Sequence, residues 1–364
     1  MSDYRTISEN NPALRKAFLA LPKRLYTRKS CPQDRKCEEQ ILTGSHLLSG
    51  DFTVYPFVVL RDGVPVSRCI LTVYPEDKEG YFGFFESEND PEAVKALFSS
   101  VEKKAKALGL TGLTGPVNAS FWIGYRLKIY RTDIRKRAVI VPPYTGEPYN
   151  LNYYALLLEG CGFSVSERYV SNHFSRVPSD YYNKKLEKRR RQFAEKGFVI
   201  RNLDLKKYEE TMRGVYRLLI ELYSDFPAFR MISEEKFMKL FASYRLIVNP
   251  EMVKLAYVEN QMAGFFICVP DYGNALYGGL SFRLIHSLLW TKKHAKRYVL
   301  LYLGADAKYP GLGSALADAV VEELRKNQAL SIGALIHEHK VTQNYVKDLT
   351  IGAEKYVLVR KTLK

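Results

Sequence analysis

The order of predicted strands and helices repeats along this chain, and the repeat restricts the folds available to it. The first series is a hairpin at 54–74, a strand at 81–86, a helix at 91–108 and a strand at 110–114. The second series is a hairpin at 253–269, a strand at 297–304, a helix after 313 and a strand at 331–336. Asp62-Gly63 favours a tight turn in the first hairpin, and Asp90-Pro91 is typical of a helix start. Strands and helices that alternate in this way predict two related α/β domains.

A basic segment indicates where the two domains join. KKLEKRRRQFAEKG at 184–197 follows Pro178-Ser179-Asp180. Leu186 and Phe193 lie seven residues apart in it, as in a helix with one buried face and one solvated basic face. We therefore expect a first domain at 1–178, a basic linker helix at 179–198 and a second domain at 199–364.

The charge of the chain favours anionic ligands, and its other composition excludes several classes of protein. Lys and Arg exceed Asp and Glu by 55 to 39, a formal charge of +16, and residues 181–364 hold 31 of the basic and 19 of the acidic residues. No apolar run is long enough for a spanning helix, and the first residues lack the apolar core of a signal peptide, so we expect a cytoplasmic protein without a membrane partner. The five cysteines are scattered and form no CxxC pair, which predicts neither a disulfide framework nor a metal site.

The segment LYLGADAKYPGLGSAL at 301–316 carries the clearest chemical signal, because it runs from an apolar strand through two glycines into a helix. Gly311 and Gly313 let the main chain approach a ligand, and the start of the following helix attracts an anion. The segment lacks the GxxxxGK of an NTP-binding loop, and the roughly 50 residues after it are too few for a dinucleotide-binding sheet. A pyrophosphate is the expected ligand, and a tight connection without a ligand is the alternative.

PGLGSA at 310–315 and the order of elements resemble the acyl-CoA-binding motif and fold of the GNAT N-acetyltransferase superfamily. The likeness to bacterial tandem GNAT-like proteins covers most of the chain, through FGFFESENDPE at 82–92, TGPVN at 114–118, VIRNLDLKKYEE at 199–210 and LGADAKYPGLGSAL at 303–316. It implies two tandem GNAT-like domains, each a mixed, mostly antiparallel sheet flanked by helices. It also implies transfer of an acetyl or other acyl group from acyl-CoA to an amine, without a metal. The cofactor-binding residues that it implies are Leu303, Gly304, Ala305, Lys308, Gly311, Leu312, Gly313, Ser314 and Ala315, with a bulge at Gly304 that turns backbone N–H groups toward the thioester.

Two positions depart from the family motif. Pro310 replaces the usual Arg or Gln, and Leu312 stands where a second basic residue is common. Two charge-assisted phosphate contacts are therefore absent. Positive charge is expected instead from Lys308 or from the nearby cluster of Lys292, Lys293, Lys296 and Arg297.

The matching turn of the first half is acidic. Glu86, Glu88 and Asp90 place three carboxylates where phosphates would lie. Because like charges repel, we expect the first domain not to bind CoA at this turn. Its expected role is to shape or cover an acceptor cleft between the two domains.

Acyl transfer to an amine needs a base for the amine proton and an acid for the leaving thiolate. Glu338 or His339, within His337-Glu338-His339, is the candidate base, and a solvated strand end is the alternative. By the resemblance, Tyr345 lies in the helix whose tyrosine protonates the departing CoA, with ordinary packing as the alternative.

The partners follow from the same resemblance. We expect a small-molecule amine or a peptide as acceptor, and a monomer or homodimer. Aromatic and basic residues alternate at 125–131 and continue in Arg135-Lys136-Arg137, as they do on RNA-binding surfaces. One alternative is therefore a Fem-like transferase that takes an aminoacyl group from tRNA, and another is a noncatalytic binding module with the GNAT fold.

Overall fold

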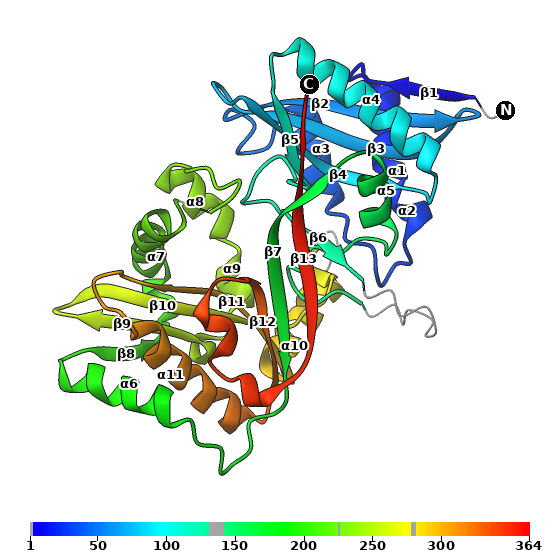
Figure 1. Ribbon diagram of the computed structural model, residues 1–364. Coiled ribbons are helices and arrows are strands. Elements are labelled where there is room, and N and C mark those ends of the chain that lie inside the picture. Colours follow the sequence, from blue (N-terminus) through cyan, green and yellow to red (C-terminus); the bar gives the residue numbers. More distant parts are fainter. Residues whose placement is uncertain (1–2, 131–141, 225, 278–281) are drawn as a thin grey trace. The chain divides into compact units, whose positions relative to one another are not determined.

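The computed structural model describes residues 3–130, 142–224, 226–277 and 282–364 (Figure 1). Its internal contacts divide the chain into two compact units. Unit 1 comprises Met1–Arg168, Tyr277–Gly279 and Lys355–Lys364, and unit 2 comprises Tyr169–Leu276 and Leu280–Glu354. Arg131 and the predicted basic run Arg135-Lys136-Arg137 lie outside the described residues.

The sheet of unit 1 follows the predicted hairpin-first order. Its strands in spatial order are β1 (Tyr4–Ile7), β2 (Thr53–Arg61), β3 (Val64–Val73), β4 (Glu79–Ser87), β5 (Gly112–Gly115) and the end of β13 (Thr350–Thr362), which also pairs with β6 (Leu127–Ile129). Neighbouring strands are antiparallel except for β4 and β5. The predicted hairpin at 54–74 is β2–β3, with Asp62 and Gly63 both at positive φ in its turn.

Helices cover both faces of this sheet. Their bounds are α1 (Pro12–Ala20), α2 (Pro22–Leu25), α3 (Arg35–Thr43), α4 (Pro91–Ala107) and α5 (Tyr154–Gly160). Helix α4 packs on β1, β2 and β3, where Phe57, Cys69 and Leu71 belong to its core cluster. Arg68 alternates with Cys69, so it points to the opposite face, and there its guanidinium contacts α1 and α3 through Phe18 O (2.7 Å) and Glu38.

The sheet of unit 2 has the same order of elements. Its strands are β7 (Ser164–Phe174), β12 (Leu330–His337), β11 (Arg297–Ala305), β10 (Gln261–Pro270), β9 (Val253–Val258) and β8 (Val199–Asn202). Strands β11 and β12 are parallel and the other neighbours are antiparallel. This mixed, mostly antiparallel sheet agrees with the predicted fold class.

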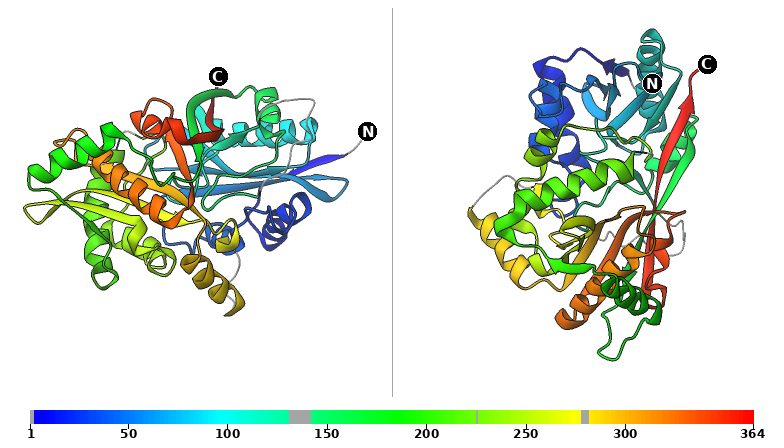
Figure 2. Two further views of the ribbon diagram at one scale, coloured as in Figure 1. Left: turned by 90° about the horizontal axis from the view of Figure 1, so that it is seen from below. Right: turned by 90° about the vertical axis from the view of Figure 1, so that its left-hand side faces the viewer.

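Two layers of helices lie on opposite sides of the unit 2 sheet (Figures 1 and 2). One layer is α6 (Lys184–Glu195) with α11 (Leu312–Asn327), and the other is α7 (Tyr208–Tyr223), α8 (Glu234–Phe241) and α9 (Tyr244–Ile247), followed along the chain by α10 (Phe282–Lys293). Alternation of side chains explains the division. Phe266 and Cys268 pack in the α11 core, whereas Ile267 between them faces α7. None of the described helices is long and apolar enough to cross a bilayer.

The units differ from the expected domains at both boundaries. Each sheet takes its sixth strand from the other half of the sequence: residues 169–174 of β7 pair with β12, and residues 355–362 of β13 pair with β5 and β6. Unit 1 therefore ends at Arg168 and regains the C-terminal strand, which we had expected in the second domain. The expected linker helix is α6, which belongs to unit 2 because Leu186 and Phe193 pack in the α11 core.

Candidate functional site

The central feature of unit 2 is an opening between its two parallel strands. Strands β11 and β12 pair only from Arg297–Leu300 with Leu330–Gly333. Beyond this level, β11 has a bulge against β10, in which Leu301 has no partner residue. The pairing of β12 with β7 also changes register, between Gly333 and Ile336. Both strands thus carry an irregularity at the same level, and they diverge from there.

Main-chain groups of β11 face this opening. Asp306 N donates to Ala263 O (2.8 Å), which fixes the alternation of hydrogen bonds along the β10–β11 ladder. Gly304 therefore directs its N–H toward β10, whereas Leu303 and Ala305 direct theirs toward the β12 side. These two amides can donate to an oxygen atom that enters between the strands.

The predicted bulge at Gly304 is wrong, because the bulge lies at Leu301 and Gly304 pairs in register with Phe265. The lack of a side chain at 304 serves packing instead. A Cβ atom there would lie 2.6 Å from Phe265 Cζ and 3.0 Å from Leu222 Cδ1. Packing against α7, rather than backbone conformation, accounts for this residue.

The turn after β11 leads into the start of α11, where the predicted anion-binding loop lies. Gly311 is the N-cap residue at φ 95°, a conformation that favours glycine, and no side chain caps the helix. Leu312 N donates to Tyr309 O (3.1 Å) and Ser314 N to Gly311 O (3.0 Å). Among the hydrogen bonds of the described residues, none uses the N–H of Gly311 or Gly313, so these two amides remain available for an anion.

The other predicted loop residues play different parts. Leu312 and Ala315 are fully buried in the α11 core, so at Leu312 the side chain serves packing. Ser314 is half-buried in the first turn of α11. Lys308 is exposed, and its N–H binds the Asp306 carboxylate (2.8 Å), which tightens the turn.

Arg189 of α6 lies over the start of α11. Its Nε and Cζ atoms are 3.1 and 3.3 Å from the position that a Cβ atom on Gly311 would occupy. The neighbouring Arg190 anchors α6 to α11 through Glu322 (2.5 Å) and Asp318 (3.4 Å). A guanidinium thus lies beside the turn whose own positions 310 and 312 carry no charge.

The spacing of Leu186 and Phe193 indicated a buried face of α6 but not the helix on which that face packs. Sequence reasoning missed Arg189 for that reason.

Tyr345 also reaches this turn. Its hydroxyl lies 3.2 Å from the position of a Cβ atom on Gly313. The residue lies between two short 3-10 helices, Val341–Asn344 and Lys347–Leu349, rather than in the expected α-helix. Asn183 holds the segment by donating to Tyr345 O (3.0 Å). The sequence-predicted acid and the sequence-predicted loop are therefore brought together.

Glu338 and His339 lie in the turn that ends β12. Their side chains are 42% and 80% exposed, and His339 Nε2 is 4.0 Å from Glu338 Oε1. The strand ends at His337, so Glu338 and His339 lie beyond the part of the chain where side chains alternate across the sheet. His337 instead packs edge-on against Tyr169, with ring centroids 5.1 Å apart.

In unit 1 the corresponding opening is filled by the chain itself. After the parallel pairing of β4 and β5, Val117 N donates to Phe82 O (2.7 Å). Asn118 then accepts at Oδ1 from Phe84 N (2.7 Å), and Phe84 has a positive φ of 49°. Side-chain and main-chain groups of 117–118 thus satisfy the β4 groups that face this opening.

The start of α4 is likewise occupied by a carboxylate of the chain. Asp90 accepts from Ala93 N (3.1 Å), Tyr4 Oη (2.9 Å) and Arg61 Nη1 (2.6 Å). Partial burial opposes its charge, but these hydrogen bonds outweigh that effect and lower the pKa of the Asp90 carboxyl. Glu88 pairs with Arg61 as well (2.7 Å). Unit 1 therefore fills the anion position of its helix with its own acidic groups.

Glu86 does not lie at this turn as the sequence suggested. Its side chain is buried and accepts hydrogen bonds from Tyr26 (2.8 Å) and Tyr154 (2.6 Å). Burial raises the pKa of the Glu86 carboxyl to about 7, against the opposing effect of the Arg68 guanidinium.

No group of three or more His, Cys, Asp or Glu residues in the described parts of the chain is arranged to hold a metal ion.

Comparison with known proteins agrees with this architecture. No protein-family model matches the sequence. The chain is 23% identical over 288 residues to the bacterial ceramide synthase of Caulobacter vibrioides, across 76% of this chain and 72% of that relative.

Solved structures extend the likeness to the whole chain. A tandem GNAT protein from the clavulanic acid biosynthesis pathway is similar at a TM-score of 0.53 and 11% identity, over 100% of this chain and 99% of its own. The GCN5-related N-acetyltransferase from Kribbella flavida is similar at a TM-score of 0.50 and 10% identity, over 100% of this chain and 71% of its own. The chain therefore has the fold of the GNAT N-acetyltransferases and, along its whole length, that of a tandem GNAT protein.

Proposed function

We propose that this protein transfers an acyl group from acyl-CoA to an amine, with the donor bound in unit 2. The observation that carries the proposal is the opening between β11 and β12 beside the uncapped start of α11. The opening offers two amides to a thioester carbonyl, and the start of α11 offers two amides to a diphosphate. In unit 1 the same two places are filled by Asn118 and Asp90, so one donor site per chain is proposed.

In the proposed reaction, the neutral amine nitrogen attacks the thioester carbonyl carbon to form a tetrahedral intermediate, and the C–S bond breaks when this intermediate collapses to the amide. The N–H groups of Leu303 and Ala305 stabilise the oxyanion of the tetrahedral intermediate. Tyr345 donates its hydroxyl proton to the departing CoA thiolate, because its hydroxyl lies beside Gly313, where a Cβ atom would also lie 3.7 Å from the Leu303 side chain of β11. Glu338 or His339 takes the proton that the amine loses, directly or through water.

Arg189 supplies the positive charge that Pro310 and Leu312 do not. Its guanidinium is adjacent to Gly311, so it can pair with a phosphate that accepts from the Gly311 and Gly313 amides. Lys308 is exposed next to the same turn and adds to the positive potential.

The proposed acceptor is the primary amine of a small molecule. The name of the Caulobacter relative, a ceramide synthase, supports an amine that bears an alkyl chain, since formation of a ceramide is N-acylation of such an amine. A peptide acceptor is the alternative that an acceptor screen distinguishes.

The test combines binding and turnover. Calorimetric titration with CoA and acetyl-CoA should show binding at micromolar concentration, and incubation of acyl-CoA with long-chain amines should release free CoA thiol with formation of an amide. Absence of CoA binding would refute the proposal. Retention of tRNA that weakens steeply with salt, together with absent CoA binding, would favour the aminoacyl-tRNA alternative.

A further inference from the structure

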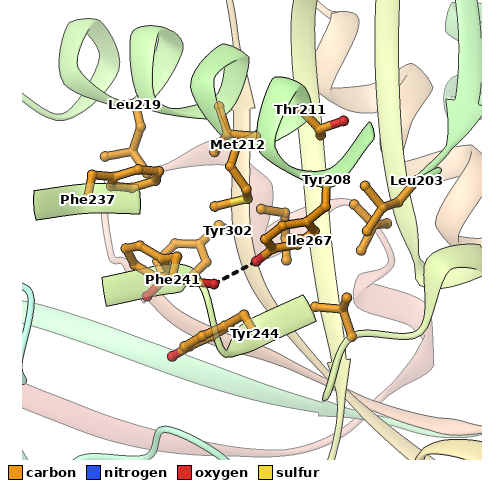
Figure 3. A pocket seen from close by; sticks show the side chains of 13 residues that line it. Leu203, Tyr208, Thr211, Met212, Leu219, Phe237, Phe241, Tyr244, Ile267 and Tyr302 are labelled. Atoms are coloured by element: carbon orange, nitrogen blue, oxygen red, sulfur yellow. Dashed lines mark hydrogen bonds between the residues drawn. The ribbon is translucent and has the colours of Figure 1, made fainter. Parts of the chain in front are cut away.

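Helices α7, α8 and α9 bury their apolar faces within unit 2. Figure 3 shows that they turn apolar side chains such as Met212, Phe237 and Tyr244 toward a shared pocket. The hydroxyl of Tyr208 at this pocket donates to Phe241 O (2.8 Å), as the dashed line in the figure marks. The apolar residues of these three helices thus have partners inside the unit.

Helix α10, which follows them along the chain, leaves apolar side chains uncovered. Ile285, Leu289 and Trp290 are 44%, 53% and 60% exposed. Among the described side chains, no other helix holds more than one exposed large apolar residue. Ile285 and Leu289 lie four residues apart and therefore on one face, which Trp290 widens. Beside α10, Leu246 of α9 is also exposed, and its carbonyl oxygen accepts from Lys292 Nζ (3.2 Å).

Positive charge borders this apolar face. The sequence has no Asp or Glu at 272–305, so α10 and β11 carry no acidic residue. Lys293 follows Leu289 by four residues and Trp290 by three, which places it on the same side of the helix as both. Lys293 and Lys296 are exposed, and neither forms an ion pair with a residue that the structure describes. The uncovered face thus combines apolar side chains with adjacent unpaired lysines.

These lysines are too far along β11 to serve the proposed donor site. The predicted cluster of basic residues ends at Arg297, where β11 begins, whereas the donor turn follows Ala305, where β11 ends. A strand rises about 3.3 Å per residue, so about 26 Å of strand lies between the two ends. The cluster that the sequence suggested for the phosphates of CoA is therefore left for another anionic partner.

We propose that α10 docks the protein on the surface of an anionic phospholipid bilayer. Ile285, Leu289 and Trp290 enter the boundary between headgroups and acyl chains, and Lys293 and Lys296 pair with lipid phosphates. Helices that lie in this boundary carry the same combination of tryptophan, aliphatic residues and lysine. An anionic bilayer has an apolar layer directly beneath a layer of negative charge, which matches apolar side chains and lysines that lie next to one another.

The inference goes beyond the proposed function and does not depend on it. It also departs from our expectation of a protein without a membrane partner. That expectation rested on the lack of a long apolar run in the sequence, and docking on the surface of a bilayer needs no such run. The exposure of α10 became visible only in the structure.

Sedimentation with lipid vesicles tests the charge contribution. The protein should bind vesicles of phosphatidylcholine mixed with phosphatidylglycerol, and should bind pure phosphatidylcholine vesicles much more weakly. Lys293→Gln should lower the partition coefficient on the mixed vesicles about fivefold at low salt. Added salt should weaken the binding of the wild type.

Leu289→Ser and Trp290→Ser test the apolar contact. About half of each side chain is exposed and can be buried in the bilayer, so each substitution should lower the partition coefficient about fivefold or more. Leu156→Ser is the matched control, since Leu156 is an equally exposed leucine (63%) on a helix of unit 1, α5. It should bind vesicles as the wild type does, and all three variants should melt close to the wild type because the replaced side chains are exposed.

Tryptophan fluorescence reports directly on α10. The chain has two tryptophans, Trp122 and Trp290, so Trp122→Phe leaves Trp290 as the single reporter. Its emission should shift to shorter wavelength when mixed vesicles are added, and brominated lipid should quench it.

Three outcomes would overturn the inference. One is a wild-type protein that does not bind the mixed vesicles at low salt. Another is binding that Leu289→Ser and Trp290→Ser leave unchanged, because a different basic surface would then hold the lipid. The third is a dimer that Trp290→Ser dissociates, since a second copy would then cover α10. Vesicle binding is measured without CoA, so a protein that binds vesicles but not CoA would keep this inference and refute the proposed function.

Discussion

Replacement of Arg189 by glutamine tests how the donor site obtains its positive charge. The guanidinium of Arg189 lies beside Gly311, and a hydrogen bond between charged groups contributes about 1.5–3 kcal/mol. Because Arg189 is exposed, water screens the contact and reduces its contribution below that range, to about 1–1.4 kcal/mol. Arg189→Gln should therefore raise the Kd for CoA about five- to tenfold, as measured by calorimetric titration at a fixed ionic strength.

Arg191 provides the matched control on the same helix. It is two residues further along α6, so it points to the other side of the helix, and its side chain is 70% exposed. Arg191→Gln removes the same charge from the chain and should leave the Kd for CoA within twofold of the wild type. Equal weakening by both substitutions would mean that only the net charge matters, and the assignment of Arg189 to the phosphate would then be wrong.

Three further predictions follow from single contacts. Gly304→Ala should lower the free energy of unfolding by about 1–3 kcal/mol, because its Cβ atom would lie 2.6 Å from Phe265 Cζ; an unchanged urea midpoint would contradict this packing. Tyr345→Phe should lower kcat tenfold or more with an unchanged Kd for CoA, whereas unchanged turnover would remove Tyr345 from the mechanism. Burial raises the pKa of Glu86 to about 7, so the folded state holds a proton that the unfolded state releases near pH 4.5. The protonated carboxyl therefore stabilises the folded state fully below pH 4.5, and this stabilisation is lost as the pH rises through 7. Glu86→Gln should therefore melt higher than the wild type at pH 8 and nearly equally at pH 5, and a constant difference across this range would refute the argument.

The sequence predicted the elements of each unit well, because their signals are local. Asp62-Gly63 set the turn of the first hairpin, and Asp90-Pro91 set the start of α4, as the structure confirms. The exchange of sixth strands could not be predicted, since β7 and β13 have the same strand pattern whichever sheet they join. Pairing partners depend on contacts between residues that are far apart in the sequence, and no local pattern reports them.

The candidate site was predictable from the sequence only where its signals are local. The two glycines at 311 and 313 identified the turn, because their chemistry depends on the residues next to them. Arg189 was not identifiable, since it reaches the turn only through the packing of α6 on α11. The bulge was expected at Gly304 because glycine is common in bulges, but the structure places it at Leu301 and uses Gly304 for packing.

The most direct test of this account is a crystal structure of the protein grown with CoA. The account predicts the diphosphate at the start of α11, within hydrogen-bonding distance of the Gly311 and Gly313 amides and of the Arg189 guanidinium, with the sulfur atom between β11 and β12. Density for CoA at any other place, or crystals that leave this turn empty at saturating CoA, would contradict it.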